Sequence, residues 1–339
     1  MTRIGAGAAR PWVAPWVPGA IVDPFARDVR DRLMQVPKTL PSKYLYDPLG
    51  SALFEAICRL PWYGVTRAEQ RLLAHEAAAI GSAADPAFIA ELGPGSGEKL
   101  AALVCGIVTA QPQTALHLHL IDISASALDL ARHTLGDLPA ANASASTKIT
   151  SSRATYEDGL RELSRVRPAQ GRAMVLFLGS NIGNFDLPEA TTLLRQARGA
   201  LRSGDTLLLG VDLVKPERDL LLAYDDPLGV TAAFNKNLLV RINTELGAAF
   251  PLDRFIHRAV WDAEASRIEM HLVSLHTQDI PIPGAGCVVH FDRDETIWTE
   301  SSYKYTTADI EQLGTSAGFV QQAQWIDREG QFALTLFGV

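Results

Sequence analysis

The chain has 339 residues, with 31 Lys and Arg against 38 Asp and Glu, so its formal net charge is −7. Hydrophobic residues make up 47% and charged residues 20%, a balance that excludes a wholly disordered chain. At about 150 residues per domain the length favours two domains, and the mild acidic excess argues against a general nucleic-acid binder.

Cysteine usage and apolar runs limit the cellular setting. Cys58, Cys105 and Cys287 are scattered without CxxC spacing, which disfavours a disulfide framework or a thiolate zinc site and favours buried free thiols. Residues 1–20 lack a continuous apolar stretch, and the run 174–178 is far shorter than the ~20 residues that a membrane span needs. We therefore expect a cytoplasmic protein with no membrane partner.

Between residues 88 and 213 short apolar strands alternate with helical segments, a pattern typical of a parallel sheet covered by helices on both faces. The predicted strands are 88–92, 116–123, 148–155, 174–179 and 206–213, and the predicted helices are 99–107, 126–136 and 188–203. Ligands of such sheets bind beyond the carboxyl ends of the strands. Residues that follow these strands are therefore the first candidates for a site.

The rhythm changes after residue 214 and returns near residue 304. Two helices and several extended runs are predicted between these points: 217–224, 230–243, 255–261, 267–277, 288–291 and 297–298. A helix capped by Thr306 or Thr307 and a strand pair at 319–326 and 332–337 follow. We infer a discontinuous α/β domain at 68–214 and 304–339, and a second α+β domain formed by 15–67 and 215–303.

A glycine-rich turn follows the first predicted strand and precedes a helix. It contains Gly93, Gly95 and Gly97, and Asp122 ends the next strand, where it would reach ribose hydroxyls. NAD, FAD and S-adenosylmethionine all suit such a loop, but the first two usually show GxGxxG, which would need glycine in place of Glu98. A turn that only lets helix and sheet pack is the structural alternative.

With Glu91 leading the glycines, the segment resembles the first motif of class I S-adenosylmethionine-dependent methyltransferases, and the terminal strand pair is similar to that fold. Three further blocks occur in order: 38–67, 177–184, and 268–270 with 299–302. Together they resemble the histidine-specific methyltransferase family, which trimethylates the α-amine of L-histidine in ergothioneine biosynthesis. The resemblance runs from about residue 37 to the C-terminus.

The resemblance implies a class I (Rossmann-like) methyltransferase domain with a second domain, and it implies a role for each matching residue. Tyr63 and Asn184 would hold the substrate carboxylate, Tyr46 and Gly179 would lie at the amine, Phe54 and Met270 would pack in the pocket, and Glu300 and Ser302 would read the imidazole. Tyr46, Gly179 and Asn184 would be the catalytic set. The cofactor would contact Gly93, Gly95, Gly97, Lys99, Asp122 and Tyr156. Thr155 stands where relatives often place Asp, which leaves the adenine contacts open.

Elementary chemistry supports this assignment. Methyl transfer from a sulfonium is an in-line displacement, so the protein chiefly positions a neutral amine, and no metal is expected. Glu300 and Ser302 are two residues apart, so on an extended segment both side chains point to one face. A carboxylate accepts a hydrogen bond from one imidazole N–H, while a hydroxyl can donate to or accept from the other nitrogen.

We therefore expect successive methylation of L-histidine to Nα-trimethylhistidine (hercynine) by a monomer that binds L-histidine and its methylated intermediates and no nucleic acid. One alternative is a relative that methylates another α-amine, such as that of tryptophan. A non-catalytic cofactor-binding protein is the alternative from another class.

Overall fold

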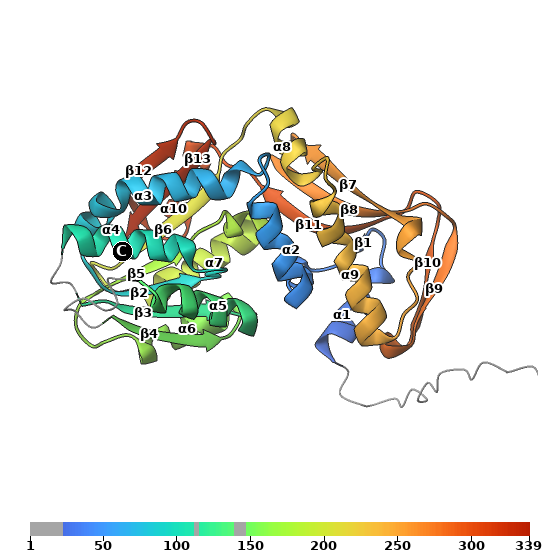
Figure 1. Cartoon of the computed structure of the whole chain (residues 1–339), viewed down its shortest axis with the longest axis horizontal. Coiled ribbons are helices and arrows are strands. Elements are labelled where there is room, and N and C mark those ends of the chain that lie inside the picture. Colours follow the sequence, from blue (N-terminus) through green and yellow to red (C-terminus); the bar gives the residue numbers. More distant parts are fainter. Residues whose placement is uncertain (1–22, 112–114, 139–146) are drawn as a thin grey trace, which may run out of the picture.

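The computed structural model describes residues 23–111, 115–138 and 147–339. Its largest element is a seven-stranded sheet with the order β12-β13-β6-β5-β2-β3-β4 (Figure 1). The strands are β2 (Pro86–Leu92), β3 (His117–Asp122), β4 (Lys148–Arg153), β5 (Arg172–Phe177), β6 (Thr206–Asp212), β12 (Val320–Asp327) and β13 (Phe332–Gly338). The strands from β6 to β4 run parallel, while β13 is antiparallel to both β6 and β12. The predicted parallel sheet and terminal strand pair are confirmed.

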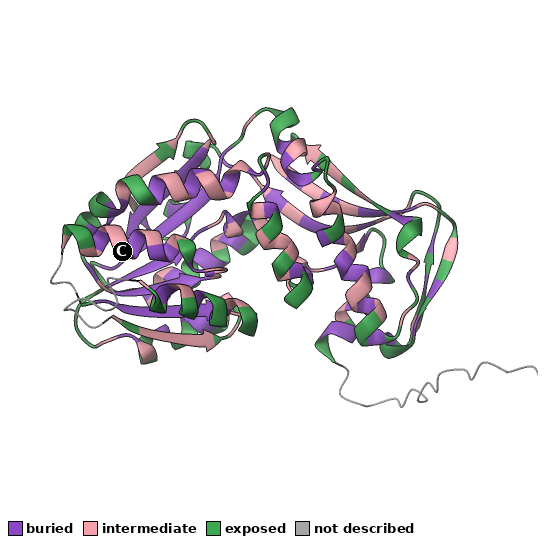
Figure 2. Cartoon of the chain, in the orientation of Figure 1, coloured by how far each residue is buried: buried purple, intermediate pink, exposed green. Residues whose placement is uncertain are grey.

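Helices cover both faces of this sheet, because successive side chains of each buried strand point to opposite faces. On one face lie α3 (Gly64–Ala84), α4 (Glu98–Ala110) and α5 (Ala125–Gly136); on the other lie α6 (Tyr156–Val166), α7 (Leu187–Ala200) and α10 (Thr307–Ser316). Within β2, for example, Ile89 packs in the first core and Phe88 in the second. Figure 2 shows the central strands of the sheet largely buried, the edge strands β4 and β12 half-buried or exposed, and the outer helix faces exposed.

A second, four-stranded sheet has the order β1-β11-β8-β7. Its strands are β1 (Lys38–Thr39), β7 (Phe255–Asp262), β8 (Arg267–Ser274) and β11 (Thr296–Tyr303), and the hairpin β9 (Gln278–Ile282) and β10 (Cys287–Phe291) extends beyond it. β1 pairs parallel with β11, which joins the N-terminal segment to the insertion. The helices of this part are α1 (Pro24–Leu33), α2 (Pro48–Cys58), α8 (Glu217–Tyr224) and α9 (Val230–Leu246).

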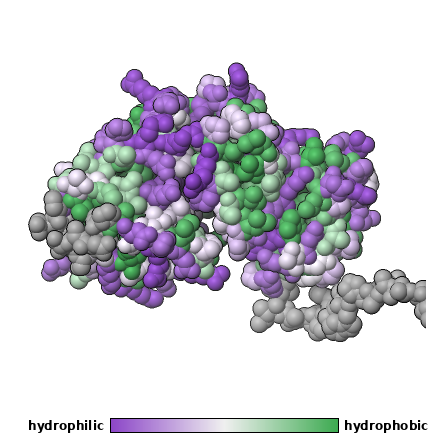
Figure 3. Space-filling view, viewed as in Figure 1, coloured by the Kyte–Doolittle hydropathy of each residue, from purple (hydrophilic) through white to green (hydrophobic). Residues whose placement is uncertain are grey.

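Short 3-10 segments complete the fold: η1 (Ser42–Leu45), η3 (Asn181–Asn184), η4 (Leu252–Arg254) and η5 (Pro283–Ala285). Figure 1 shows α2 between the two sheets, and Figure 3 shows apolar side chains gathered on the visible face around it. One apolar core contains Leu73 and Ile89 on the seven-stranded side and Phe234 and Leu272 on the other. Because this core is continuous, the proposed domain boundaries stay a prediction.

Several sequence expectations need correction. The predicted strand 148–155 ends at Arg153, since Thr155 caps α6 and Tyr156 begins it. The run at 297–298 belongs to the eight-residue β11, which includes Glu300 and Ser302. Thr306 caps α10, as predicted. The three cysteines are free, but each is half-buried rather than buried.

Candidate active site

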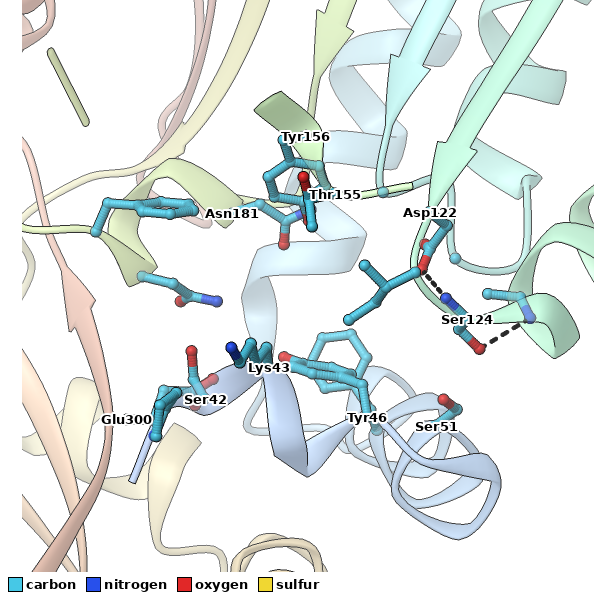
Figure 4. A pocket seen from close by; sticks show the side chains of 18 of the residues that line it. Ser42, Lys43, Tyr46, Ser51, Asp122, Ser124, Thr155, Tyr156, Asn181 and Glu300 are labelled. Atoms are coloured by element: carbon cyan, nitrogen blue, oxygen red, sulfur yellow. Dashed lines mark hydrogen bonds between the residues drawn. The ribbon is translucent and has the colours of Figure 1, made fainter. Parts of the chain in front are cut away.

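A cavity of about 990 Å³ opens between the carboxyl edge of the seven-stranded sheet and the elements α2 and β11. Figure 4 shows Glu300 and Tyr46 on one side and Asp122 with Ser124 on the other, with Tyr156 and Asn181 along a further wall. A smaller inner recess of about 30 Å³ shares Tyr46, Phe54, Asn181, Asn184 and Glu300 with this cavity. The large cavity and the small recess are therefore adjacent.

Two glycines of the loop after β2 line the large cavity, whereas the third serves packing. Gly93 and Gly95 have φ values of +71° and +54° and line the cavity. A Cβ on Gly93 would lie 2.8 Å from the Tyr156 hydroxyl oxygen. A Cβ on Gly97 would instead lie 2.9 Å from the Ala131 Cα in α5, and Gly97 does not line the cavity. Gly97 is therefore needed for the close packing of α4 on α5, and its predicted cofactor contact stays a prediction.

Asp122 and Tyr156 lie on the cavity wall next to this loop. The Asp122 Oδ1 accepts a hydrogen bond from the Ser124 backbone N–H at 2.8 Å, which fixes the carboxylate at the end of β3. Burial raises the pKa of Asp122, and the backbone N–H groups of Ser124 and Ile123 oppose that shift. The Tyr156 ring packs edge-on against Phe177 with centroids 5.2 Å apart. The wall thus offers a hydrogen-bond acceptor and an aromatic face.

A buried acidic group that the sequence motifs did not reveal lies beneath the loop. The Glu69 carboxylate, with no exposed side-chain surface, accepts the Gly179 backbone N–H at 2.8 and 2.9 Å and pairs with Lys99 Nζ at 2.9 Å. Lys99, a predicted cofactor residue, is absent from the described cavity lining and reaches the site through this pair. Glu69 lies on the apolar face of α3 with Val65 and Leu72. A single acidic residue on an apolar face is the sequence feature from which a buried functional carboxylate could have been predicted.

Glu91 lies at the end of β2 and is 1% exposed. Burial raises its pKa to about 8, since the Lys99 ammonium only partly opposes the effect and Glu69 adds to it. Its Oε2 has no hydrogen-bond partner within the described structure. A buried carboxyl oxygen without a partner calls for an explanation, and a bound group that completes the pairing would supply one.

The inner recess brings together every residue that the sequence assigned to the substrate. Its lining includes Tyr46, Phe54, Tyr63, Gly179, Asn184, Met270, Glu300 and Ser302, which come from segments far apart in the chain. The lining also includes residues that sequence reasoning missed, namely Ile57, Ser180, Asn181, Ala223, Tyr224, Thr231 and Phe234. The missed residues come largely from α8 and α9, where no motif distinguishes them.

Aromatic rings form the wall of the recess. Tyr46 packs edge-on against Phe54 and Phe234, with centroids 5.5 Å apart in both pairs. Tyr63 packs in the same way against Tyr224 at 6.0 Å. Burial raises the pKa of Tyr46 and of Tyr63 well above the ordinary value, so both hydroxyls stay neutral. Neutral hydroxyls can orient a carboxylate or an amine without carrying a charge.

Glu300 and Ser302 project into the recess from β11, where a bulge between Trp298 and Glu300 shifts the register against β8. Burial raises the pKa of Glu300 to about 7, while the Lys304 ammonium and a hydrogen bond from Tyr46 oppose the shift. The Ser302 hydroxyl lies 2.8 Å from that of Tyr224. Both predicted imidazole-reading groups are therefore buried, and the Ser302 hydroxyl belongs to a polar network with Tyr224 and Lys304.

The side of the recess that Gly179, Ser180 and Asn184 form rests on β11 by backbone contact. Gly179 and Ser180 lead from β5 into η3, which carries Asn184. A Cβ on Gly183 would lie 2.8 Å from the Tyr303 carbonyl oxygen and 3.3 Å from its nitrogen. Only glycine therefore lets η3 rest directly on the end of β11.

The sheet order with its single antiparallel strand, the glycine loop after β2 and the acid that ends β3 define a class I S-adenosylmethionine-dependent methyltransferase fold. The model of the histidine-specific, S-adenosylmethionine-dependent methyltransferases matches residues 25–339, and the chain belongs to this family.

Curated relatives agree with this family. The histidine N-alpha-methyltransferase of Mycobacterium tuberculosis is 37% identical, over 91% of this chain and 93% of that protein. Ergothioneine biosynthesis protein 1 of Neurospora crassa is 30% identical over 85% of this chain, which matches 32% of that longer protein. The L-tryptophan methyltransferase trpM of Psilocybe serbica is 26% identical over 88% of this chain and 87% of its own length.

The residues present fit S-adenosylmethionine. Gly93 and Gly95 leave their backbone open, Asp122 offers an acceptor to ribose hydroxyls, and Glu91 has an unpaired buried oxygen. Among the described residues, no group of three or more His, Cys, Asp or Glu side chains is placed to hold a metal ion.

Proposed function

We propose that this protein methylates the α-amine of L-histidine with S-adenosylmethionine, in successive steps that end at Nα-trimethylhistidine, the hercynine of ergothioneine biosynthesis. The observation that carries the proposal is the recess in which Glu300 and Ser302 face Tyr46, Tyr63 and Asn184. The recess of about 30 Å³ is too small to hold L-histidine by itself, so the substrate would extend from it into the adjoining cavity that fits the cofactor, as methyl transfer requires.

Each end of the substrate has matching groups in the recess. Tyr63 and Asn184 donate hydrogen bonds to the carboxylate, and neither carries a charge that would favour a protonated amine. Glu300 accepts one imidazole N–H and Ser302 pairs with the other ring nitrogen, while Phe54 and Met270 pack against the ring.

The amine is held at the junction of the two spaces. S-adenosylmethionine, when bound, supplies an activated methyl group. Tyr46 lines the recess together with Glu300, and its neutral hydroxyl can accept an amine N–H and orient the nitrogen. Gly179 lines the recess through its backbone, because a Cβ at this position would lie 2.7 Å from Lys99 Nζ. Tyr46, Gly179 and Asn184 are the proposed catalytic set.

Tryptophan is the second candidate substrate, because the relative trpM is similar along most of its length. An indole has one N–H and no second ring nitrogen, so it would leave one of Glu300 and Ser302 unpaired. Leaving a buried polar group unpaired costs about 1–3 kcal/mol, which favours histidine. The complete recess also favours an enzyme over a non-catalytic cofactor-binding protein.

We further propose that the protein acts as a cytoplasmic monomer without nucleic-acid or membrane partners. The formal charge of −7 supports the absence of a nucleic-acid partner. None of the helices in the described ranges is both long and apolar enough to cross a bilayer. Size-exclusion chromatography with light scattering tests the monomer, and a particle of twice the 36.7 kDa chain mass would contradict it.

Product analysis tests the activity. The purified protein is incubated with S-adenosylmethionine and single amino acids, and mass spectrometry identifies the products. We expect mono-, di- and trimethylated histidine, and a Glu300→Ala variant should lose histidine turnover by about a hundredfold or more while any tryptophan turnover falls by less. Glu264→Ala, in the exposed turn between β7 and β8, is the matched control. Absence of methylated histidine would refute the proposal.

A further inference from the structure

Lys304 is a buried cation that none of the roles above uses. It follows β11 and is 2% exposed. Its Nζ lies 2.9 Å from Asp212 Oδ2, 2.8 Å from the Tyr224 hydroxyl and 2.9 Å from the Ser302 Oγ. An ammonium has three N–H donors and no acceptor, so these partners use all of its donors. Lys304 therefore acts on the recess through Tyr224 and Ser302, which both line it.

The charge on Lys304 is held by Asp212, the last residue of β6. Burial alone lowers the pKa of Lys304, but the Asp212 carboxylate and Tyr224 outweigh it and raise the pKa above its ordinary value. Asp212 is itself 1% exposed, and its Oδ1 also pairs with Lys215 Nζ at 2.6 Å. Lys304 consequently remains a donor to both hydroxyls.

This fixed donor gives the hydroxyl pair a single favoured direction. Tyr224 and Ser302 each use one oxygen lone pair to accept from Lys304, and their oxygens are 2.8 Å apart, so one hydroxyl donates to the other. A phenol is the more acidic hydroxyl and the better donor, so Tyr224 donates to Ser302. Both lone pairs of Ser302 are then occupied. Its own proton is the group that remains for a ligand.

We propose that Lys304 and Tyr224 are positioning residues that hold Ser302 as a hydrogen-bond donor, so that the recess takes L-histidine as one neutral imidazole tautomer. The ring N–H faces Glu300 and the nitrogen lone pair faces Ser302. The inference rests on the proposed function, since it takes L-histidine as the substrate. A serine hydroxyl can either donate to or accept from a ring nitrogen, and here Ser302 donates.

The charges around the ring support this selection. Glu300 attracts a second proton to the imidazole, and Asp212, behind Lys304, would do the same. The Lys304 ammonium opposes both, while Tyr46, Tyr63 and Tyr224 add no charge. An imidazolium would also set an N–H against the Ser302 O–H, which leaves two donors facing each other. The ring therefore stays neutral although a carboxylate lies beside it.

Nitrogen NMR of bound substrate tests the proposal. L-histidine with ¹⁵N in both ring positions is bound with S-adenosylhomocysteine, and the ring signals are followed as the pH falls through about 6.5, the ordinary imidazole pKa. In the wild-type complex we expect one protonated and one unprotonated nitrogen throughout. In Lys304→Met, whose Asp212 keeps Lys215, the bound ring should gain its second proton at least about tenfold more readily.

Three further variants separate this role from a structural one. Tyr224→Phe keeps the ion pair but frees a Ser302 lone pair, which can then accept from a second ring N–H, so the bound ring should gain its second proton more readily and KM for histidine should rise about tenfold with kcat within about twofold. Lys215→Met loses a lysine from the same carboxylate, and Tyr305→Phe loses a buried tyrosine hydroxyl outside the recess; both should keep the wild-type signals.

The outcomes are distinguishable. A wild-type protein that binds no histidine contradicts the proposed function. Bound histidine that is doubly protonated in the wild type overturns the inference alone, as does a Tyr224→Phe complex whose ring resists its second proton as strongly as in the wild type. If Lys304→Met does not fold, Tyr224→Phe decides the question, because its ion pair is intact.

Discussion

Glu69 fixes the positions of two groups next to the proposed cofactor site, the Gly179 N–H and the Lys99 side chain. Its carboxylate holds the Gly179 N–H through both oxygens and pairs with Lys99, so a residue of α3 fixes a backbone group after β5 and a side chain of α4. A charge in a buried position is kept only where partners compensate it. Glu69 is thus a positioning residue that sets where Gly179 and Lys99 lie.

Glu69→Gln tests this role. The variant keeps the side-chain shape but leaves the Lys99 ammonium without its counter-charge, so Lys99 and Gly179 should move from their present places. We expect binding of S-adenosylhomocysteine, measured by calorimetry, to weaken about tenfold and kcat to fall more than KM rises. Glu76→Gln, further along the same helix, serves as the control. Unchanged binding and kcat in Glu69→Gln would contradict the role.

At this scale, motif blocks allowed the sequence to predict Tyr46, Tyr63, Asn184, Glu300 and Ser302, and all five line one recess. Tyr224, Phe234 and Lys304 escaped prediction because their proximity to the recess depends on the docking of α8, α9 and β11. The hydrophobic periodicity of those segments does not predict how they pack against the rest of the chain.

Among the elements, the turn between β2 and α4 combines two uses of glycine. Gly95 and Gly97 both have left-handed φ values, of +54° and +78°. A Cβ on Gly95 would meet only Glu55 Oε1, at 3.9 Å, whereas a Cβ on Gly97 would collide with the backbone of Ala131. The first glycine therefore serves the cavity, and the second serves the packing of two helices.

A matched pair of substitutions separates these uses. Gly97→Ala should lower the free energy of unfolding by about 2–4 kcal/mol, from backbone strain plus overpacking. Gly95→Ala should lower it by only about 1 kcal/mol, but it should weaken S-adenosylhomocysteine binding. Urea denaturation and calorimetry measure the two effects. Equal destabilisation by both substitutions would contradict the assignment.

The sequence predicted the functional residues of β11 but not most of the strand itself. Only residues 297–298 look like a strand, because polar side chains follow them. The bulge after Trp298 turns both Thr299 and Glu300 inward, so burial in this strand does not alternate simply. Polar residues in a buried strand obscure the alternation of apolar and polar residues from which a strand is predicted. The same polar residues indicate that the strand contributes to a functional site.

For the whole molecule, buried carboxyl groups make stability depend on pH. Burial raises the pKa of Glu91 to about 8 and that of Glu300 to about 7, both from 4.5. The folded ligand-free protein therefore binds more protons than the unfolded chain above about pH 6.5, where the histidines of the unfolded chain are largely neutral. With that sign, stability must fall as the pH rises.

We expect the free energy of unfolding of the ligand-free protein to fall by about 1–2 kcal/mol for Glu91 alone between about pH 6.5 and 8. Glu91→Gln should remove this part of the slope and be the more stable protein at pH 8. Urea unfolding at both pH values measures it, with Glu264→Gln as the control. A stability that rises with pH over this range would refute the expectation.

The contact between Gly183 and Tyr303 limits the length of substrate that the recess can accept. It brings the backbone between Gly179 and Asn184, the proposed amine and carboxylate side, against the strand that carries Glu300 and Ser302, the proposed imidazole-reading residues. The span between those two ends is therefore set by main chain and not by flexible side chains. Length becomes a criterion in its own right: L-homohistidine, with one extra methylene and every hydrogen-bonding group intact, should be methylated at least about tenfold more slowly than L-histidine.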